Sequence, residues 1–177
     1  MINENNVKSN FEKPTVTVVF EMMQKAAKNH MLDDWRDVHA LIGISERTFR
    51  RWKQHVDTQP NKISPIGFQG YALLYAVAEQ KPYIQPIECD VSKIPAHLIM
   101  CAEQFNGLKT DEIRSIIGLK GLTKTGIKVI AQNVGISPNE LSKQTLEETL
   151  TFGTWAMILQ LCGVPIDKIL YSRKDKE

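Results

Sequence analysis

The sequence predicts an all-α protein of two small helical bundles, each containing a helix-turn-helix, joined by a proline-containing linker. Three observations predict this fold class. Apolar residues recur at helical intervals along most of the chain. A glycine followed by isoleucine and serine, a pattern typical of a tight turn that leads into a helix, occurs at Gly43 and again at Gly135. Three prolines fall between these two places, within residues 81–95.

Composition excludes several classes of protein. The 177 residues, 42% of them apolar, are enough for one domain or two small ones. No apolar run approaches the roughly 20 residues that cross a bilayer, and the N-terminus lacks the charged-then-apolar order of a secretory signal. We therefore expect a cytoplasmic protein without a membrane partner. The three cysteines are odd in number and widely spaced, so we expect no disulfide framework, no metal site and no cofactor.

Charge is concentrated in one short segment. The net charge of the chain is only +2, yet residues 46–53 contain four cations and one anion. Local fields steer a protein toward phosphate more effectively than the total charge does. This segment therefore indicates a nucleic-acid contact.

The first domain is expected at residues 15–80, after a polar, flexible tail at residues 1–14. A helix is predicted from about Val18, although the β-branched run at residues 15–19 leaves a short strand open. Its apolar residues should cover the pair of helices that follows. They are Val19, Met22, Met23 and Ala26.

The first helix of that pair is predicted to be capped by Asp33 or Asp34 and to end at Gly43, which tolerates positive φ. Its apolar face is formed by Val38, Leu41 and Ile42. Ile44 should fill the gap between the two helices, and the Ser45 hydroxyl should cap the second helix.

In the second helix, Phe49 and Trp52 fall three residues apart on one face, while charged side chains fall on the others. The aromatic residues should face inward and the arginines outward. A helix held in this way fits the major groove, where arginine bonds bidentately to guanine and glutamate accepts from cytosine.

Residues 35–54 resemble the helix-turn-helix of the lambda repressor/Cro-like family in apolar positions, turn glycine and small polar capping residue. The stretch departs from that family at His39, where the family has a small residue. The resemblance implies DNA binding by the second helix. The implied base-reading residues are Glu46, Arg47 and Arg51, and those expected near the DNA backbone are Ser45, Thr48, Arg50 and Lys53.

A further helix is predicted to open at Ser64-Pro65, with serine as its cap and proline in its first turn. An almost unbroken apolar run follows and indicates burial. It comprises Phe68, Tyr71, Ala72, Leu74, Tyr75 and Val77. Residues 81–95 are then expected to be an extended linker.

The second domain is expected at residues 96–172, before a charged tail at residues 173–177. Helices are predicted at residues 97–105, at residues 110–119 with Thr110 or Asp111 as cap, and around a second helix-turn-helix at Gly135. In this second turn, Ser137 is the expected cap and Leu141 the buried residue. The run from Ile113 through GVPIDKIL at residues 163–170 again resembles the lambda repressor/Cro-like family.

An internal sequence similarity suggests that the two halves arose by duplication of one helical unit. One alignment places Gly43 on Gly121, and a competing alignment places it on Gly135. The Gly135 alignment is favoured because the Gly121 alignment puts Lys120 at an apolar position.

The predicted helix at residues 137–144 of the second half has no arginine and no net charge, so it should bind DNA less strongly than residues 45–54. Residues 151–163 are apolar enough to fill a core and to form a dimer interface, so we expect a homodimer or a protein partner there. The candidates for a second DNA site are Lys124, Lys128, Asn139 and Lys143.

These patterns predict a sequence-specific transcriptional regulator that binds double-stranded DNA and is not an enzyme. The alternative is a DNA-tethered adaptor or antitoxin-like protein whose second half binds another protein. An enzyme such as a recombinase or nuclease fragment ranks last, because no nucleophile with a base, no carboxylate cluster and no phosphate-binding glycine loop is visible. No catalytic residue is therefore assigned.

Overall fold

The computed structural model describes residues 11–170, and the predicted all-α class is confirmed for this part of the chain. Its helices are α1 Val16–Asn29, α2 Val38–Leu41, α3 Glu46–Trp52, α4 Phe68–Glu79, α5 Thr110–Ile116, α6 Ile127–Val134, α7 Pro138–Leu146 and α8 Phe152–Leu161. Short 3-10 turns lie between several of them. No strand forms within the described residues, where extended pairing is limited to two isolated bridges. None of the helices described is long and apolar enough to span a bilayer.

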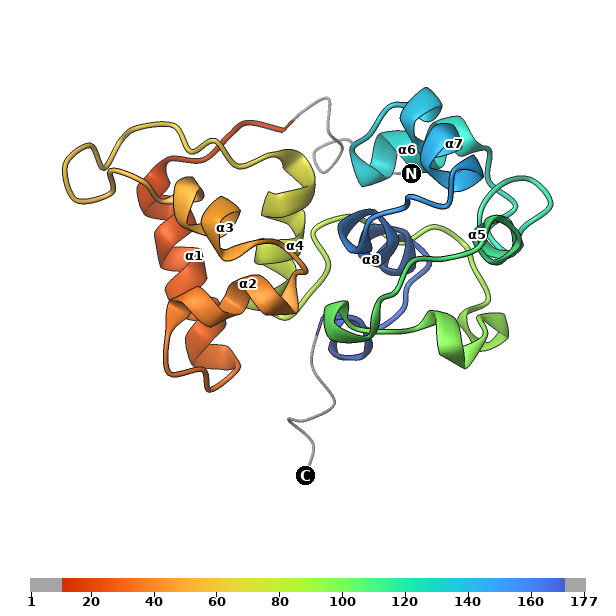
Figure 1. Cartoon of the computed structure of the whole chain (residues 1–177), viewed down its shortest axis with the longest axis horizontal. Helices are drawn as coiled ribbons and strands as arrows, with labels where there is room; N and C mark the ends of the chain where they lie inside the picture. Colours follow the sequence, from red (N-terminus) through yellow and green to blue (C-terminus); the bar gives the residue numbers. More distant parts are fainter. Residues whose placement is uncertain (1–10, 171–177) are drawn as a thin grey trace.

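Helices α4 and α8 pack together in the middle of the molecule (Figure 1). Helices α1 to α3 lie on one side of this pair and α5 to α7 on the other (Figure 1). The two central helices are the most apolar, and nearly every residue of α8 is buried. The buried residues of both halves form one continuous hydrophobic cluster. Burial of α4 and α8 against each other therefore joins the two halves.

Helix α1 forms as predicted, starting two residues before Val18, and the possible strand is limited to a single bridge at Thr15. The Thr15 hydroxyl accepts a hydrogen bond from the Val18 N–H at 3.4 Å and caps the helix. The predicted apolar side chains are buried, and the helix packs against α4 while touching α2 and α3. An ion pair between Lys25 and Glu79, 2.7 Å apart, ties α1 to the end of α4.

The predicted start of α4 is wrong. The helix begins at Phe68 with Gly67 as its N-cap, and not at Ser64-Pro65. Ser64 is buried, and its hydroxyl donates to the Trp52 carbonyl at 2.6 Å and accepts from the Ile66 N–H at 3.3 Å. The Ser64 side chain therefore caps the C-terminal end of α3, where the Trp52 carbonyl has no partner within the helix.

The helix predicted at residues 97–105 is also wrong. Two 3-10 turns occupy this stretch, Ala96–Leu98 and Ala102–Gln104, and Ile99 between them is extended. The Leu98 carbonyl accepts a hydrogen bond from the buried Trp155 indole N–H at 2.9 Å. That bond uses a carbonyl that a continuous helix would need, so tertiary packing overrides the local helical pattern.

Helix α5 forms, but its predicted cap is wrong. The N-cap is Lys109, and Thr110 is already the first helical residue. The Glu112 carboxylate accepts from the Lys109 N–H at 2.7 Å, and the Glu148 carboxylate accepts from the Thr110 N–H at 3.0 Å. The carboxylates of Glu112 and Glu148 thus take the place of the expected Thr110 or Asp111 cap at the positive end of the helix.

The segment assigned to the linker, residues 81–95, contains no α-helix and touches the core. Ile84 and Ile94 are buried, and the Ile87 N–H donates to the Leu161 carbonyl of α8 at 2.8 Å. Residues 1–10 and 171–177, which hold most of the two predicted tails, lie outside the described residues. Phe11, in the described part of the first tail, packs on Phe68 of α4 with ring centroids 5.6 Å apart.

Candidate nucleic-acid interface

The turn between α2 and α3 follows from three consecutive residues. Gly43 adopts a φ of +66°, a left-handed conformation that costs glycine little. The next residue, Ile44, donates its N–H to the His39 carbonyl at 3.2 Å, and its carbonyl contacts the His39 ring Nδ1 at 2.8 Å. Ser45 then caps α3 by accepting from the Thr48 N–H at 3.2 Å. His39 therefore contacts the turn through both its main-chain carbonyl and its ring.

The inner face of α3 is anchored by aromatic rings. Phe49 and Trp52 are buried, as predicted, with ring centroids 5.6 Å apart. Trp35, just before α2, stacks on Phe49 at 6.0 Å and meets Phe20 of α1 edge to face at 5.5 Å. Burial of this cluster fixes the orientation of α3, and so of the residues on its opposite face.

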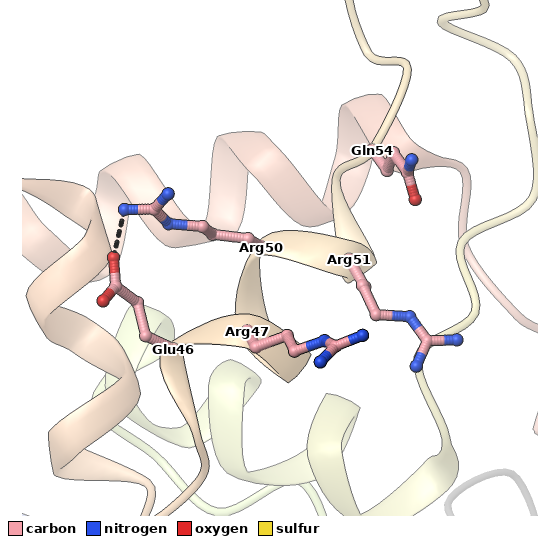
Figure 2. A pocket seen from close by; sticks show the side chains of 5 residues that line it. All are labelled: Glu46, Arg47, Arg50, Arg51 and Gln54. Carbon is pink, nitrogen blue, oxygen red and sulfur yellow. Dashed lines mark hydrogen bonds and ion pairs between the residues drawn. The ribbon is translucent and has the colours of Figure 1, made fainter.

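The outer face of α3 carries the predicted base-reading residues. Together with Arg50 and Gln54, these residues line a surface hollow of about 510 Å³ (Figure 2). Arg50 forms an ion pair with Glu46, one helical turn earlier. The Arg47 and Arg51 side chains extend to the same side, away from Glu46 (Figure 2).

Arg47 and Arg51 form no ion pair with any residue in the described part of the chain. Both side chains are exposed to solvent. Two guanidinium groups on one face without a carboxylate between them create a local positive potential. The arrangement is therefore suited to receive an anionic group or a row of hydrogen-bond acceptors.

The residues expected near the DNA backbone have different environments. Ser45 and Thr48 are exposed at the start of α3, where the Ser45 hydroxyl donates to the Thr48 hydroxyl at 2.9 Å. Lys53 is half-buried, and its ammonium lies 4.5 Å from the Phe20 ring centroid and 4.9 Å from that of Trp35. Cation–π contacts thus hold Lys53 against the aromatic cluster.

Sequence reasoning missed a second ion pair beside α3. The Arg36 Nε donates to Asp34 at 2.7 Å, and the Asp34 carboxylate also accepts from the Arg36 N–H at 2.8 Å. These hydrogen bonds, chiefly the side-chain one, lower the pKa of Asp34 to about 2. The positive charge of Arg36 is therefore satisfied within the protein, unlike the charges of Arg47 and Arg51. Asp34 was predicted only as a helix cap, which it is for the 3-10 turn Trp35–Asp37.

The second set of candidate residues is less compact. Asn139 and Lys143 are exposed on α7, and Lys128 is exposed on α6. Lys124 lies in the loop before α6 with a φ of +47°. It lines a pocket of about 590 Å³ whose lining includes none of the other three.

The described residues contain no group of three or more His, Cys, Asp or Glu side chains arranged for a metal ion. The three cysteines are free. Burial, with a smaller effect from the neighbouring Cys89, raises the pKa of the Cys162 thiol far above its ordinary value. No family model, curated protein or solved structure matches the chain.

Proposed function

We propose that the chain is a sequence-specific DNA-binding protein in which α2, the turn at Gly43 and α3 form a helix-turn-helix. One observation carries this proposal. Arg47 and Arg51 are exposed, with no ion pair to any residue from 11 to 170, on the outer face of a helix whose inner face is anchored by Phe49 and Trp52. Rigid support with free arginines is what direct reading of base edges requires.

The residues on and next to α3 have different roles in this proposal. Arg47 and Arg51 donate bidentate hydrogen bonds to guanine O6 and N7 in the major groove. The Arg50 side chain turns toward Glu46, which holds it in place (Figure 2), and in this proposal it contacts the phosphates. The exposed hydroxyls at the N-terminus of α3 add backbone contacts. Lys53 supports the aromatic cluster and adds long-range attraction for phosphate.

The biological role that follows is transcriptional regulation by occupancy of an operator. In this proposal the protein binds DNA and carries out no reaction on it. Phosphate contacts should supply much of the affinity and make it depend steeply on salt, while base contacts supply the sequence preference.

The test is selection of bound sequences from random duplexes, followed by affinity measurements at several salt concentrations. Arg47→Ala should lower the affinity for the selected site by about 5- to 150-fold and relax one base position. Arg114→Ala is the matched control, since Arg114 is exposed on α5, outside the proposed interface. The proposal fails if no sequence is enriched, or if Arg47→Ala and Arg114→Ala behave alike.

A DNA-tethered adaptor is the second candidate function. In this function a partner would bind the second half, where Leu119 and Leu146 are each more than 60% exposed. The adaptor function predicts that substitutions on the outer face of α7 leave DNA binding unchanged.

A further inference from the structure

The two halves of the chain are packed on each other reciprocally. The turn glycine of the first half, Gly43, lies against the ring of Phe152, the first residue of α8. The turn glycine of the second half, Gly135, lies against the ring of Phe68, the first residue of α4. In both places the ring occupies the space that a Cβ would need. Each half thus presents a turn glycine and a phenylalanine ring to the other half.

The two turns also have the same local structure. Gly135 has a φ of +81°, and the following Ile136 donates its N–H to the Ala131 carbonyl at 3.1 Å. This bond spans five residues, as does the bond from Ile44 to His39 in the first turn. Gly121, the alternative partner of Gly43, lies in a different loop between α5 and α6. The equivalence therefore follows the Gly135 alignment.

The helices after the turns begin in the same way. Ser137 caps α7 by accepting from the Glu140 N–H at 3.1 Å, just as Ser45 caps α3. The fourth residue after each serine, Phe49 or Leu141, is fully buried. Helices α3 and α7 are therefore equivalent elements in the two halves.

Reciprocal contact is the signature of an isologous, two-fold interface, in which residue i touches residue j and j touches i. Here both sides belong to one chain. The interface between the two halves also buries α8, which lies in the segment, residues 151–163, expected from the sequence to form a dimer interface. Every side chain of α8 except the glycine is buried in the chain itself, at 6% exposure or less.

We propose that this single chain is the covalent equivalent of a helix-turn-helix dimer and binds two unlike DNA half-sites as a monomer. The inference rests on the proposed function of α3. It adds that α7 is a second reading helix and that the DNA site lacks two-fold symmetry. A second copy of the chain is not required.

The equivalence assigns the residues that read the second half-site. Arg47 and Arg51 lie two and six residues after Ser45, and Asn139 and Lys143 lie at the same distances after Ser137. Asparagine at such a position pairs bidentately with adenine, whereas arginine pairs with guanine. We therefore expect guanine in the half-site of α3 and adenine in that of α7. The α3 half-site should dominate affinity, because α7 carries one anion, Glu140, and one cation, Lys143, and so has no net charge, whereas α3 carries three arginines against one glutamate.

The experiment combines a mass measurement with selection from random duplexes. Light scattering on the full chain, free and bound to the selected duplex, should give one chain of 20.1 kDa per duplex. The selected site should contain two different half-sites. Asn139→Ala should relax adenine preference in one half-site alone, by about 5- to 150-fold, and Arg47→Ala should relax the other. Lys143→Ala should weaken the same half-site as Asn139→Ala, whereas Lys168→Ala, which removes an equal exposed charge outside α7, should not.

The outcomes separate this inference from the proposed function. Two chains on a palindromic site would overturn the inference and leave the function of α3 intact. One chain on a single half-site that is indifferent to Asn139→Ala and Lys143→Ala would also overturn it, in favour of the adaptor function of the second half. Absence of any enriched sequence would overturn the proposed function itself.

Discussion

The three arginines of α3 differ in whether they form an ion pair within the described chain. Arg50 is paired with Glu46, and both side chains are about half exposed, at 53% and 44%. Exposed pairs of this type contribute little to stability, so their loss should leave the fold unchanged. Arg47 and Arg51 have no such partner in the described chain. Single substitutions can therefore separate the proposed phosphate contact of Arg50 from the proposed base reading by Arg47 and Arg51.

Arg50→Ala should weaken binding to all sequences by a similar factor, because it removes a phosphate contact and no base contact. The slope of log affinity against log salt should fall by about 1. Affinity titrations with the selected site and with a scrambled duplex, at matched salt concentrations, would measure this. A change in sequence preference in place of a uniform loss would assign Arg50 to base reading.

At the scale of the helix, the two serine caps should contribute equally. Ser45→Ala and Ser137→Ala each remove a side-chain acceptor from the first turn of a helix, and each should lower the free energy of unfolding by about 1 kcal/mol. Ser142→Ala, on the exposed face of α7, is the matched control and should have almost no effect. Urea denaturation would measure all three, and unequal losses at the two caps would contradict their equivalence.

Helix α5 is tied to the end of α7 by one carboxylate. Glu148 accepts from the Thr110 N–H and pairs with Lys109 at 3.2 Å, and these contacts lower its pKa from the ordinary value of 4.5. A lowered pKa means that the Glu148 carboxyl group binds its proton less tightly in the folded protein than in the unfolded chain. The stability that Glu148 contributes is therefore present above pH 4.5 and is lost as the pH falls through the lowered pKa of the folded protein. Glu148→Gln should therefore be less stable than the parent at pH 7, and the difference should shrink at about pH 3. Urea midpoints at the two pH values would show this, and a pH-independent difference would refute it.

At the scale of the whole molecule, the packing of the two halves can be tested through their turn glycines. Gly118→Ala suffers only the cost of a side chain at positive φ, about 1–2 kcal/mol, because nothing lies within 4 Å of its Cβ position. Gly135→Ala adds a clash with Phe68 and should cost about 1–3 kcal/mol more. Gly43→Ala, which meets Phe152, should behave like Gly135→Ala. Thermal denaturation of the three variants would check this, and equal losses at Gly118 and Gly135 would show that the reciprocal contacts contribute nothing.

The sequence pattern was sufficient to predict a helix where that helix is fixed by its own caps and apolar face. The periodicity of Val19, Met22 and Met23, the glycine turns and the serine caps predicted α1, α3 and α7 correctly, because caps and apolar faces act within one or two turns. The pattern failed at Ser64 and at residues 97–105. There the deciding hydrogen bonds join residues 12 and 57 positions apart, from Ser64 to Trp52 and from Trp155 to Leu98.

The sequence by itself determined the helical class and the exposed arginine face of α3, since both depend on spacing along one helix. Only the tertiary structure decided which arginines have no ion pair within residues 11–170 and which helices cover α8. Spacing indicates which residues share a face, but it does not indicate what lies opposite that face. The reciprocal placement of Gly43 on Phe152 and Gly135 on Phe68 joins residues more than 60 positions apart, so it exists only once the chain has folded.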